Sequence, residues 1–402
     1  MKVLLVNSLY HPNMIGGAER SVQFLAEALL QKGHRPVVVT TSPRGTSRVE
    51  EVNGVKVHYV GLRNVYWPFS GQPNPTLLKP FWHLLDTDNP WMVRAVERIV
   101  DAEQPDVVHT NSLAGFSVQI WQAVKRRRRP LVHSIWDYYL LCPRSSMFHR
   151  GKNCAAPCLT CRPFAGPRRR LSQKVDAVIA ISQFMLDRHL QFGYFRDTPL
   201  RRIIYNPQRR TTALVRARPE RTATGRLRLG FLGRLHPTKG LDRLLSALQG
   251  LPAEGLELHV AGKGTTEYEN QLRHDYPLPN VQYLGFAKPE ELFSRIDVLV
   301  VPSVWHEPLP RTVFEAYAHG VPVLGAQRGG IPEIIEPERT GLLFDPDQPE
   351  TLQRGIQQFQ RNPDLIRKMG ERALAKAQEF LPERIVAEHE QVYDAVRGGK
   401  PS

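Results

Sequence analysis

The sequence alternates short runs of β-branched and other apolar residues with amphipathic stretches. Residues 18–32 show the helical pattern most clearly, with Val22, Leu25 and Leu29 on one face and Gly33 directly after the stretch. Apolar strands that alternate with helices are typical of a parallel sheet covered on both faces. The runs in the first half of the chain are residues 2–7, 35–41, 55–61, 106–110, 130–135 and 176–182.

After a polar, arginine-rich stretch the same alternation begins again. A chain of 402 residues is long for one domain, so we predict an α/β protein of two Rossmann-like domains that face each other across a cleft. We expect an N-terminal domain over residues 1–206, a C-terminal domain over 207–378, and a final helix within 379–402 that crosses back to the N-terminal domain. Residues 207–222 are the expected linker. The runs of the second half are residues 227–234, 256–262, 281–286, 297–303, 322–326 and 341–345.

Positive charge is concentrated in the N-terminal part of the chain. The formal net charge is +15; residues 1–250 hold 38 lysines and arginines against 16 acidic residues, whereas residues 251–402 hold 16 against 23. The densest runs, residues 125–129 and 168–170, suit a polyanion, although a solvated surface is the simpler interpretation. No nucleic-acid-binding motif accompanies them, so we expect an anionic membrane surface, and no nucleic acid, as a partner of the N-terminal domain.

The hydropathy of the chain predicts where the protein works. Residues 1–12 hold one lysine and an apolar stretch of four residues, which is too short for the core of a signal peptide and is typical of a first strand. The sequence has no run of about 18 apolar residues. We therefore expect a cytoplasmic protein that is peripheral to the inner face of the membrane.

Two sequence elements are suited to a diphosphate. Gly16 and Gly17 stand directly before the first helix, where glycines let N–H groups approach a phosphate, although the pair could also be a simple turn. Arg234 and Lys239 follow a strand of the second domain, so their charges would lie at the edge where open α/β sheets bind ligands. Two cations there would neutralise a leaving diphosphate; a surface ion pair is the alternative.

Residues 301–334 carry two carboxylates in a pattern suited to sugar hydroxyls. Glu307 falls in a polar loop and Glu315 in the following helix, so one can face a sugar while the other faces a ribose. Carboxylates suit vicinal hydroxyls because they accept two donors at once. The N–H groups at the helix start would meet phosphate oxygens. That start comprises Leu309, Pro310, Arg311 and Thr312.

Taken in order along the chain, these motifs resemble those of the retaining GT-B glycosyltransferases of glycosyltransferase family 4. The family signature of two glutamates separated by seven residues is matched by Glu307 and Glu315 within EPLPRTVFE. The resemblance covers nearly the whole chain. The other matching segments are residues 16–17, 180–182, 205–207, 233–240, 260–264 and 329–335.

The resemblance implies transfer of a hexosyl group, with retention, from a UDP or GDP sugar to a glycan or lipid-linked acceptor in polysaccharide or glycoconjugate biosynthesis. A nucleotide-sugar epimerase of the same fold and a non-catalytic nucleotide-sugar-binding protein are the alternatives. Glu307 would bind the donor sugar, Glu315 the ribose, and Arg234 with Lys239 the diphosphate. No cofactor would be required for catalysis. The remaining donor-binding positions would be Gly16, Gly17, Gly233, Gly262, Ala287, Leu309, Pro310, Arg311 and Thr312.

The acceptor half matches the family less closely. Where relatives often carry a histidine before an aspartate, this sequence has Trp136 before Asp137. His109, Trp136 and Asp137 are the candidate acceptor contacts, and His133 is expected to be a buried structural residue. Asp137 is also counted among the catalytic residues with Glu307, Arg234 and Lys239. The resemblance implies that the leaving phosphate takes the acceptor proton, so no protein base is assigned.

All four cysteines lie between residues 142 and 161, in C-x3-C and C-x2-C spacing. Clustered thiols in a chain expected to be cytoplasmic suit a structural zinc ion better than disulfides. Free or transiently oxidised thiols and an iron–sulfur cluster are the alternatives. The expected ligands are Cys142, Cys154, Cys158 and Cys161.

Residues 66–92 contain six aromatic side chains among prolines. Such a segment could stack on acceptor sugars or enter a membrane surface, and ordinary packing between helices is the alternative. The six are Tyr66, Trp67, Phe69, Phe81, Trp82 and Trp91.

Overall fold

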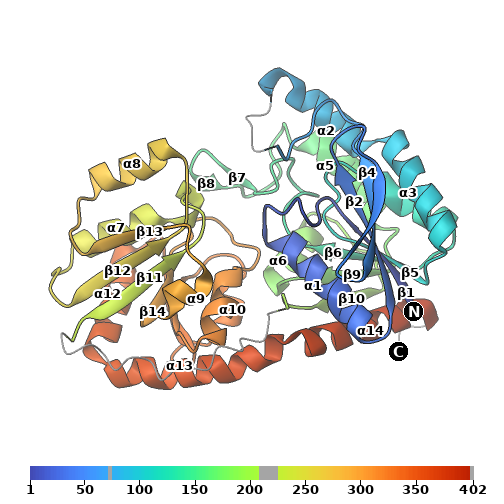
Figure 1. The fold of residues 1–402 in the computed structure, drawn as a ribbon. Coiled ribbons are helices and arrows are strands. Elements are labelled where there is room, and N and C mark those ends of the chain that lie inside the picture. The colour runs from blue at the N-terminus through green and yellow to red at the C-terminus, as the bar shows by residue number, and fades with distance from the viewer. Residues whose placement is uncertain (71–74, 208–224, 399–402) are drawn as a thin grey trace. The chain divides into compact units, whose positions relative to one another are not determined.

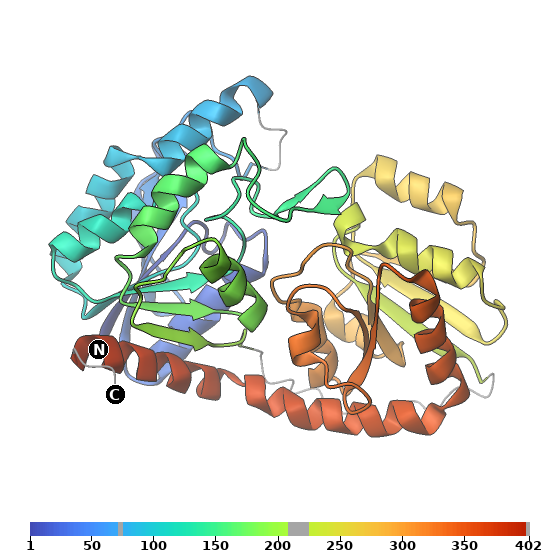
Figure 2. The ribbon, with the colours of Figure 1, turned by 180° about the vertical axis from the view of Figure 1, so that it is seen from behind.

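The computed structural model describes residues 1–70, 75–207 and 225–398. The chain divides into two compact units, and each has one parallel sheet with helices on both faces (Figures 1 and 2). The predicted α/β class with two Rossmann-like domains is therefore confirmed. Of the linker expected at 207–222, only Pro207 lies within the described residues. Unit 1 comprises Met1–His149, Cys154–Pro207 and Pro382–Ser402, and unit 2 comprises Arg150–Asn153 and Gln208–Leu381.

Unit 1 is built on an eight-stranded sheet in the order β10-β9-β6-β5-β1-β2-β4-β3. Neighbouring strands are parallel except β3, which pairs antiparallel with β4. All six predicted runs of this half form strands, whereas β3 and β10 are additional. The strands are β1 (Lys2–Asn7), β2 (Arg35–Ser42), β3 (Arg48–Val52), β4 (Val55–Gly61), β5 (Val107–Thr110), β6 (Leu131–Ile135), β9 (Ala177–Ala180) and β10 (Leu200–Ile203). Two-residue strands outside this sheet are β7 (Phe148–His149) and β8 (Lys152–Asn153).

The helices of unit 1 include the last helix of the chain, which packs against the first. Ile385, Val386 and Tyr393 of the last helix join the core formed by the first helix and the sheet, and Lys32 and His34 both contact Glu390. The C-terminal segment thus completes the core of unit 1 (Figure 1). The helices are α1 (Gly17–Gln31), η1 (Thr76–Leu78), α2 (Lys79–Thr87), α3 (Pro90–Glu103), α4 (Gln119–Arg126), α5 (Arg162–Ser172), α6 (Gln183–Gln191) and α14 (Pro382–Gly398).

Unit 2 has a six-stranded, all-parallel sheet in the order β13-β12-β11-β14-β15-β16. Each of its strands was predicted from the sequence. The strands are β11 (Leu227–Leu232), β12 (Leu256–Ala261), β13 (Val281–Gly285), β14 (Val298–Val301), β15 (Val323–Ala326) and β16 (Gly341–Phe344). The helices are η2 (Pro237–Lys239), α7 (Leu241–Gln249), α8 (Thr266–Asp275), α9 (Pro289–Phe293), α10 (Arg311–Ala318), α11 (Ile331–Ile334), α12 (Pro349–Arg361), α13 (Pro363–Ala377) and η3 (Gln378–Phe380).

Both sheets contain a point at which the strand order reverses. In unit 1 the chain builds outward on one side from β1 and on the other side from β5; in unit 2 it builds outward from β11 and from β14. The loops that leave the two central strands diverge at such a point, which opens a crevice at the carboxyl edge of the sheet. Each unit therefore has one edge at which a ligand site is expected.

Candidate functional site

At the switch point of unit 2, a lysine after β11 meets a glutamate after β14. Lys239 ends the short turn η2, and its Nζ forms an ion pair with Oε1 of Glu307. Ser303 Oγ donates a hydrogen bond of 2.8 Å to the same carboxylate oxygen. The structure thus brings together two predicted site residues that are 68 positions apart in the sequence.

The ion pair fixes the charge of Glu307. The Glu307 carboxylate is buried, and burial alone would raise its pKa. The charge of Lys239 and hydrogen bonds from Lys239, Trp305 and Ser303 outweigh this effect and lower the pKa below its usual range. Glu307 is therefore ionised at neutral pH and is an acceptor for hydroxyl groups.

Two glycines let the backbone close around this ion pair. Gly240 has φ +70°, and a Cβ atom there would lie 1.9 Å from the carbonyl oxygen of Pro302. Gly329 has φ +58°, and a Cβ atom there would lie 2.1 Å from the carbonyl oxygen of Glu307. The next N–H group, that of Gly330, donates to the same carbonyl at 2.8 Å. The glycines of both motifs are therefore required for the approach of the two loops.

Other predicted donor residues follow strands β11, β12 and β13 of the same sheet. Arg234 is exposed and has no ion-pair partner among the described residues. Gly233 and Gly262 follow neighbouring strands, and a Cβ atom on Gly262 would lie 1.8 Å from the Gly233 carbonyl oxygen. Ala287 follows β13, which is three strands from β14 in the sheet.

Helix α10 carries the second glutamate. Glu315 is half-buried, and its Oε1 lies 3.9 Å from Nε of Arg311, one turn earlier. Leu309 and Pro310 are buried directly before the helix, and Thr312 is half-buried in its first turn. The helix start thus follows the same β14 loop that carries Glu307, as the sequence predicts.

Two polar side chains at this edge were missed by the sequence analysis. Ser303 follows β14 and binds Glu307, a role that its place at a strand end could have suggested. Asn153, which belongs to unit 2, donates from Nδ2 to the Val304 carbonyl at 2.9 Å and accepts from the His306 N–H at 2.8 Å. No sequence signal indicates the role of Asn153, because 151 positions separate it from Val304.

At the switch point of unit 1, Gly16 is the N-cap of α1, and its N–H group donates to Glu19 at 2.9 Å. Gly16 is exposed and Gly17 is half-exposed. Burial is the main cause of a raised pKa at Glu19. The Gly16–Gly17 pair is thus the start of a long helix, and it follows β1 at the switch point of the sheet.

Asp137 and Trp136 follow β6 at the same edge. Trp136 Nε1 donates to Oδ1 of Asn111 at 2.9 Å, and Asp137 Oδ1 accepts the N–H of Tyr139 at 2.7 Å. Burial, aided by the charge of Glu19 and opposed by the Tyr139 hydrogen bond, raises the pKa of Asp137 to about 6. Both side chains remain partly exposed and are suited to contact a ligand.

His109 and His133 lie in the core and not at this edge of the sheet. His109 is fully buried, with Nδ1 2.8 Å from the Tyr393 hydroxyl and Nε2 2.7 Å from Ser134 Oγ. Burial, with the neighbouring His389 and His133, lowers its pKa well below the usual value. His133 is buried as well, as the sequence analysis expects. Because both ring nitrogens of His109 are occupied, we leave it out of the acceptor site proposed below.

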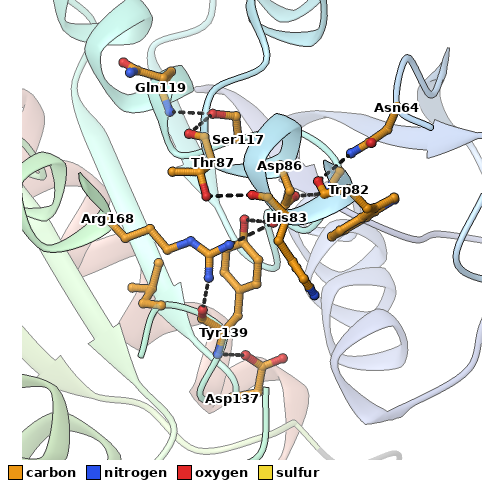
Figure 3. Close-up of polar contacts among 12 residues, drawn as sticks. Asn64, Trp82, His83, Asp86, Thr87, Ser117, Gln119, Asp137, Tyr139 and Arg168 are labelled. Atoms are coloured by element: carbon orange, nitrogen blue, oxygen red, sulfur yellow. Dashed lines mark hydrogen bonds and ion pairs between the residues drawn. The ribbon is translucent and has the colours of Figure 1, made fainter. Parts of the chain in front are cut away.

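A buried polar network holds the loop that carries Asp137 (Figure 3). Arg168 Nη2 lies 2.9 Å from Oδ2 of Asp86, and the Tyr139 hydroxyl donates to the same oxygen at 2.7 Å. Arg168 also donates to the Tyr139 carbonyl and lies 4.0 Å above the Tyr139 ring. Arg168 and Asp86 are both 0% exposed, so the most basic helix of the sequence places one arginine in the core.

The four cysteines gather in one loop region of unit 1. The Sγ atoms of Cys158 and Cys161 are 3.1 Å apart, and those of Cys161 and Cys142 are 3.9 Å apart. Burial raises the pKa of Cys154, and the nearby Cys142 and Cys158 raise it further. Within the described part of the chain, no three histidine, cysteine, aspartate or glutamate side chains are arranged so that they could hold a metal ion.

Some aromatic side chains of residues 66–92 are packed against neighbours, and others are exposed. Trp82 is buried, and its Nε1 donates to the Tyr66 carbonyl at 3.2 Å. Trp67 and Phe69 pack edge to face with ring centroids 5.1 Å apart. Phe81 and Trp91 are 59% and 47% exposed. None of the described helices is long and apolar enough to cross a membrane.

Two family models match the chain in succession. Glycosyltransferase Family 4 matches residues 15–207, and Glycosyl transferases group 1 matches residues 217–376. A relative described as an uncharacterized 42.6 kDa protein in the cps region of Klebsiella pneumoniae is 34% identical over 83% of this chain and 87% of its own length. A GDP-mannose-dependent alpha-mannosyltransferase of Mycobacterium tuberculosis (strain CDC 1551 / Oshkosh) is 28% identical over 86% of this chain and 84% of its own length.

Solved structures share the fold. Sucrose-phosphate synthase from Thermosynechococcus elongatus aligns with a TM-score of 0.75 at 20% identity, over 99% of this chain and 100% of that one. HepE of Anabaena, in complex with UDP and glucose, aligns with a TM-score of 0.70 at 20% identity, over 98% and 100%. At these identities the likeness concerns the fold alone.

Fold and comparisons together define a glycosyltransferase of the GT-B type. The chain belongs to glycosyltransferase family 4, with the group 1 domain in its C-terminal half.

Proposed function

We propose that this glycosyltransferase moves a hexosyl group from a nucleoside-diphosphate sugar to a glycan or lipid-linked acceptor, with retention, in polysaccharide or glycoconjugate biosynthesis. The observation that carries the proposal is the Lys239–Glu307 ion pair at the switch point of unit 2, with Arg234 exposed beside it. One carboxylate and two cations at that edge suit a sugar joined to a diphosphate. The name of one relative, a GDP-mannose-dependent alpha-mannosyltransferase, supports a nucleoside-diphosphate sugar as donor, and we propose a UDP or GDP sugar.

The proposed chemistry is electrostatic. As the bond between the sugar and the diphosphate breaks, negative charge grows on the leaving phosphate, and Lys239 and Arg234 stabilise that charge. Glu307 holds the sugar hydroxyls and Glu315 the ribose. The N–H groups of Leu309, Arg311 and Thr312 face phosphate oxygens. The departing phosphate takes the proton of the acceptor hydroxyl, so these residues need no metal or other cofactor for transfer. Gly233, Gly262 and Ala287 complete the donor site within unit 2, and Gly16 and Gly17 of unit 1 remain predicted donor contacts.

Asp137 and Trp136 are the proposed acceptor contacts. A carboxyl group with a pKa of about 6 exchanges its proton near neutral pH, so Asp137 can orient an acceptor hydroxyl as acceptor or donor of a hydrogen bond. Trp136 offers an indole face, which suits the apolar face of a sugar ring. We also propose that the protein works in the cytoplasm at the inner face of the membrane, with unit 1 toward the anionic lipid surface.

A thermal-shift screen with UDP-, GDP- and ADP-sugars tests the donor assignment. One nucleotide class should raise the melting temperature, because a ligand that binds only the folded state stabilises it by mass action. The Glu315→Ala variant should lose that shift and the transfer activity. Full activity of this variant would contradict the assigned site, and sugar conversion without any acceptor would indicate an epimerase instead.

We further propose that the four cysteines hold a structural zinc ion. Their side chains would have to rearrange to bind it, because no three of the described side chains are placed to hold a metal. Tetrahedral ligation with zinc–sulfur bonds of about 2.3 Å places sulfurs about 3.8 Å apart, close to the 3.9 Å between Cys161 and Cys142. The Cys158 and Cys161 sulfurs, 3.1 Å apart, would have to separate on binding.

Metal analysis of the purified protein tests this proposal. We expect about one zinc per chain, lost in Cys142→Ser and in Cys154→Ser. Thiol titration in denaturant separates the alternatives, since it counts four free thiols in the reduced protein and fewer if a disulfide has formed. Metal-free protein of full thermal stability would overturn the assignment.

A further inference from the structure

The basic run at residues 125–129 is largely neutralised within unit 1. Lys125 lies 2.7 Å from Asp176, and Arg126 and Arg127 both lie 2.8 Å from Glu97. Hydrogen bonds from the two arginines overcome the effect of burial and lower the pKa of Glu97. The run therefore offers less free positive charge than its sequence suggests.

Unpaired positive charge gathers instead around a cavity at the carboxyl ends of β2 and β4. These strands are parallel neighbours, and Ser42 pairs with Gly61 at their ends, so the segments that follow them lie side by side. A cavity of about 790 Å³ lies between these segments and the start of α3. A second cavity of about 240 Å³ adjoins it and shares Ser47, Gly61, Arg63 and Trp91. The larger volume is within the range of small-molecule sites.

Four arginines line this arginine pocket: Arg44, Arg63, Arg94 and Arg98, of which the last two lie one turn apart on α3. No aspartate or glutamate lines either cavity in the described part of the chain. There, too, none of the four guanidinium groups forms an ion pair. Glu97 lies between Arg94 and Arg98 in sequence, but its carboxylate binds Arg126 and Arg127. The pocket therefore presents guanidinium groups, which bind phosphate through paired N–H donors.

Exposed apolar side chains line the arginine pocket and extend along α2, which contributes Leu85 to the larger cavity. Val65 and Trp91 line the larger cavity and are 43% and 47% exposed. Leu77, Phe81 and Leu84, spaced four and three residues apart along η1 and α2, are 87%, 59% and 57% exposed. This spacing places them on one helix face. An exposed apolar face beside an anion-binding pocket suits a ligand with one phosphorylated and one hydrocarbon part.

We propose that the arginine pocket binds the diphosphate that joins the acceptor glycan to a lipid, and that the apolar face of η1 and α2 contacts the lipid chain. The proposal rests on the proposed function, since it names the class of acceptor. It also accounts for the contacts of α2 with both the pocket and the loop that carries Asp137. Asn64 of the pocket donates to the Trp82 carbonyl on α2 at 3.2 Å, and Asp86, one turn later, holds Tyr139 (Figure 3).

The sheet sets the distance between the diphosphate and the transfer point. Asp137 follows β6 and the pocket begins beyond β2, and these strands are three places apart in the order β6-β5-β1-β2. With strands about 4.8 Å apart, this separation is about 14 Å. An acceptor that carries sugars between its diphosphate and the reacting hydroxyl fits this separation, whereas a bare phosphorylated lipid would not reach Asp137.

Calorimetric titration of the full chain with a soluble short-chain prenyl diphosphate tests the proposal. The variant Arg63→Gln/Arg94→Gln should bind it at least about tenfold more weakly than the wild type, because two charge-assisted contacts are lost. The control Arg169→Gln/Arg170→Gln removes the same charge from exposed positions on α5 and should keep wild-type affinity. The corresponding prenyl alcohol should not bind, and inorganic diphosphate should bind more weakly than the prenyl ester.

Two outcomes would overturn the assignment. Equal affinity of the wild type and Arg63→Gln/Arg94→Gln would show that the pocket is not the diphosphate site. If the Arg63→Gln/Arg94→Gln variant lost binding to phosphatidylglycerol vesicles but still bound prenyl diphosphate like the wild type, the pocket would be a site for membrane headgroups instead. The thermal shift with the nucleotide sugar is a separate readout. It should be the same in both double variants, and its absence from the wild type would count against the proposed function and not against the pocket.

Discussion

Replacing Lys239 by methionine should lower kcat/KM for sugar transfer by about 10²- to 10³-fold, the usual effect of removing one group that stabilises charge in a transition state. The same change should destabilise unit 2, because it leaves the buried Glu307 carboxylate without its partner. Breaking a fully buried pair costs about 3–5 kcal/mol. The Lys239 side chain is 26% exposed, so we expect a smaller loss, about 2 kcal/mol.

A double variant separates the two effects of Lys239. Lys239→Met/Glu307→Gln removes both charges and should recover most of the stability while staying inactive, since neither the diphosphate nor the sugar would be held. Lys368→Met is a matched control on the exposed surface of α13 and should leave activity and stability unchanged. Chemical denaturation and initial-rate kinetics measure the two effects. A Lys239→Met enzyme with wild-type kcat/KM would remove Lys239 from the proposed mechanism.

The two sheets could be predicted because a buried parallel strand is a local apolar run. Strand β3 was missed because it is an edge strand whose residues are exposed or half-exposed, so its sequence, RVEEV, lacks a buried run. The meeting of Lys239 and Glu307 could also be predicted. Lys239 and Glu307 each follow a strand, and residues after parallel strands meet at one edge of the sheet.

The rest of unit 1 depends on contacts between distant parts of the chain. From the sequence, His109 seemed to lie at a strand end and to suit a ligand. In the structure it lies within β5, α14 covers its side chain, and Tyr393 binds it. The residues around His109 do not indicate that the last helix covers this part of the sheet. Likewise, the arginines of the pocket come from three separate segments. Three of the five basic residues at 125–129 pair with Glu97, Asp101 and Asp176. Charge pairing of this kind leaves no local pattern in the sequence.

Replacing Arg168 by methionine should destabilise unit 1 by about 3–5 kcal/mol at neutral pH, because Asp86 would keep a fully buried charge without a partner. Methionine fills a similar volume, so the loss would come mainly from electrostatics. Arg170→Met, on an exposed position of the same helix, should have little effect. In the Asp86→Asn/Arg168→Met variant the remaining amide is neutral, and we expect part of the stability to return.

The pH dependence of this loss identifies its cause. Burial raises the pKa of Asp86, while the charge of Arg168 and hydrogen bonds from Gly115 and Tyr139 lower it. Without Arg168 the folded-state pKa should rise further above the unfolded value of about 4. A raised folded-state pKa adds stability below the unfolded value, and this stability is lost as the pH rises through the folded value. The difference in unfolding free energy between wild type and Arg168→Met should therefore grow from pH 4 to pH 7. A difference that does not change with pH would indicate lost packing rather than an unpaired carboxylate.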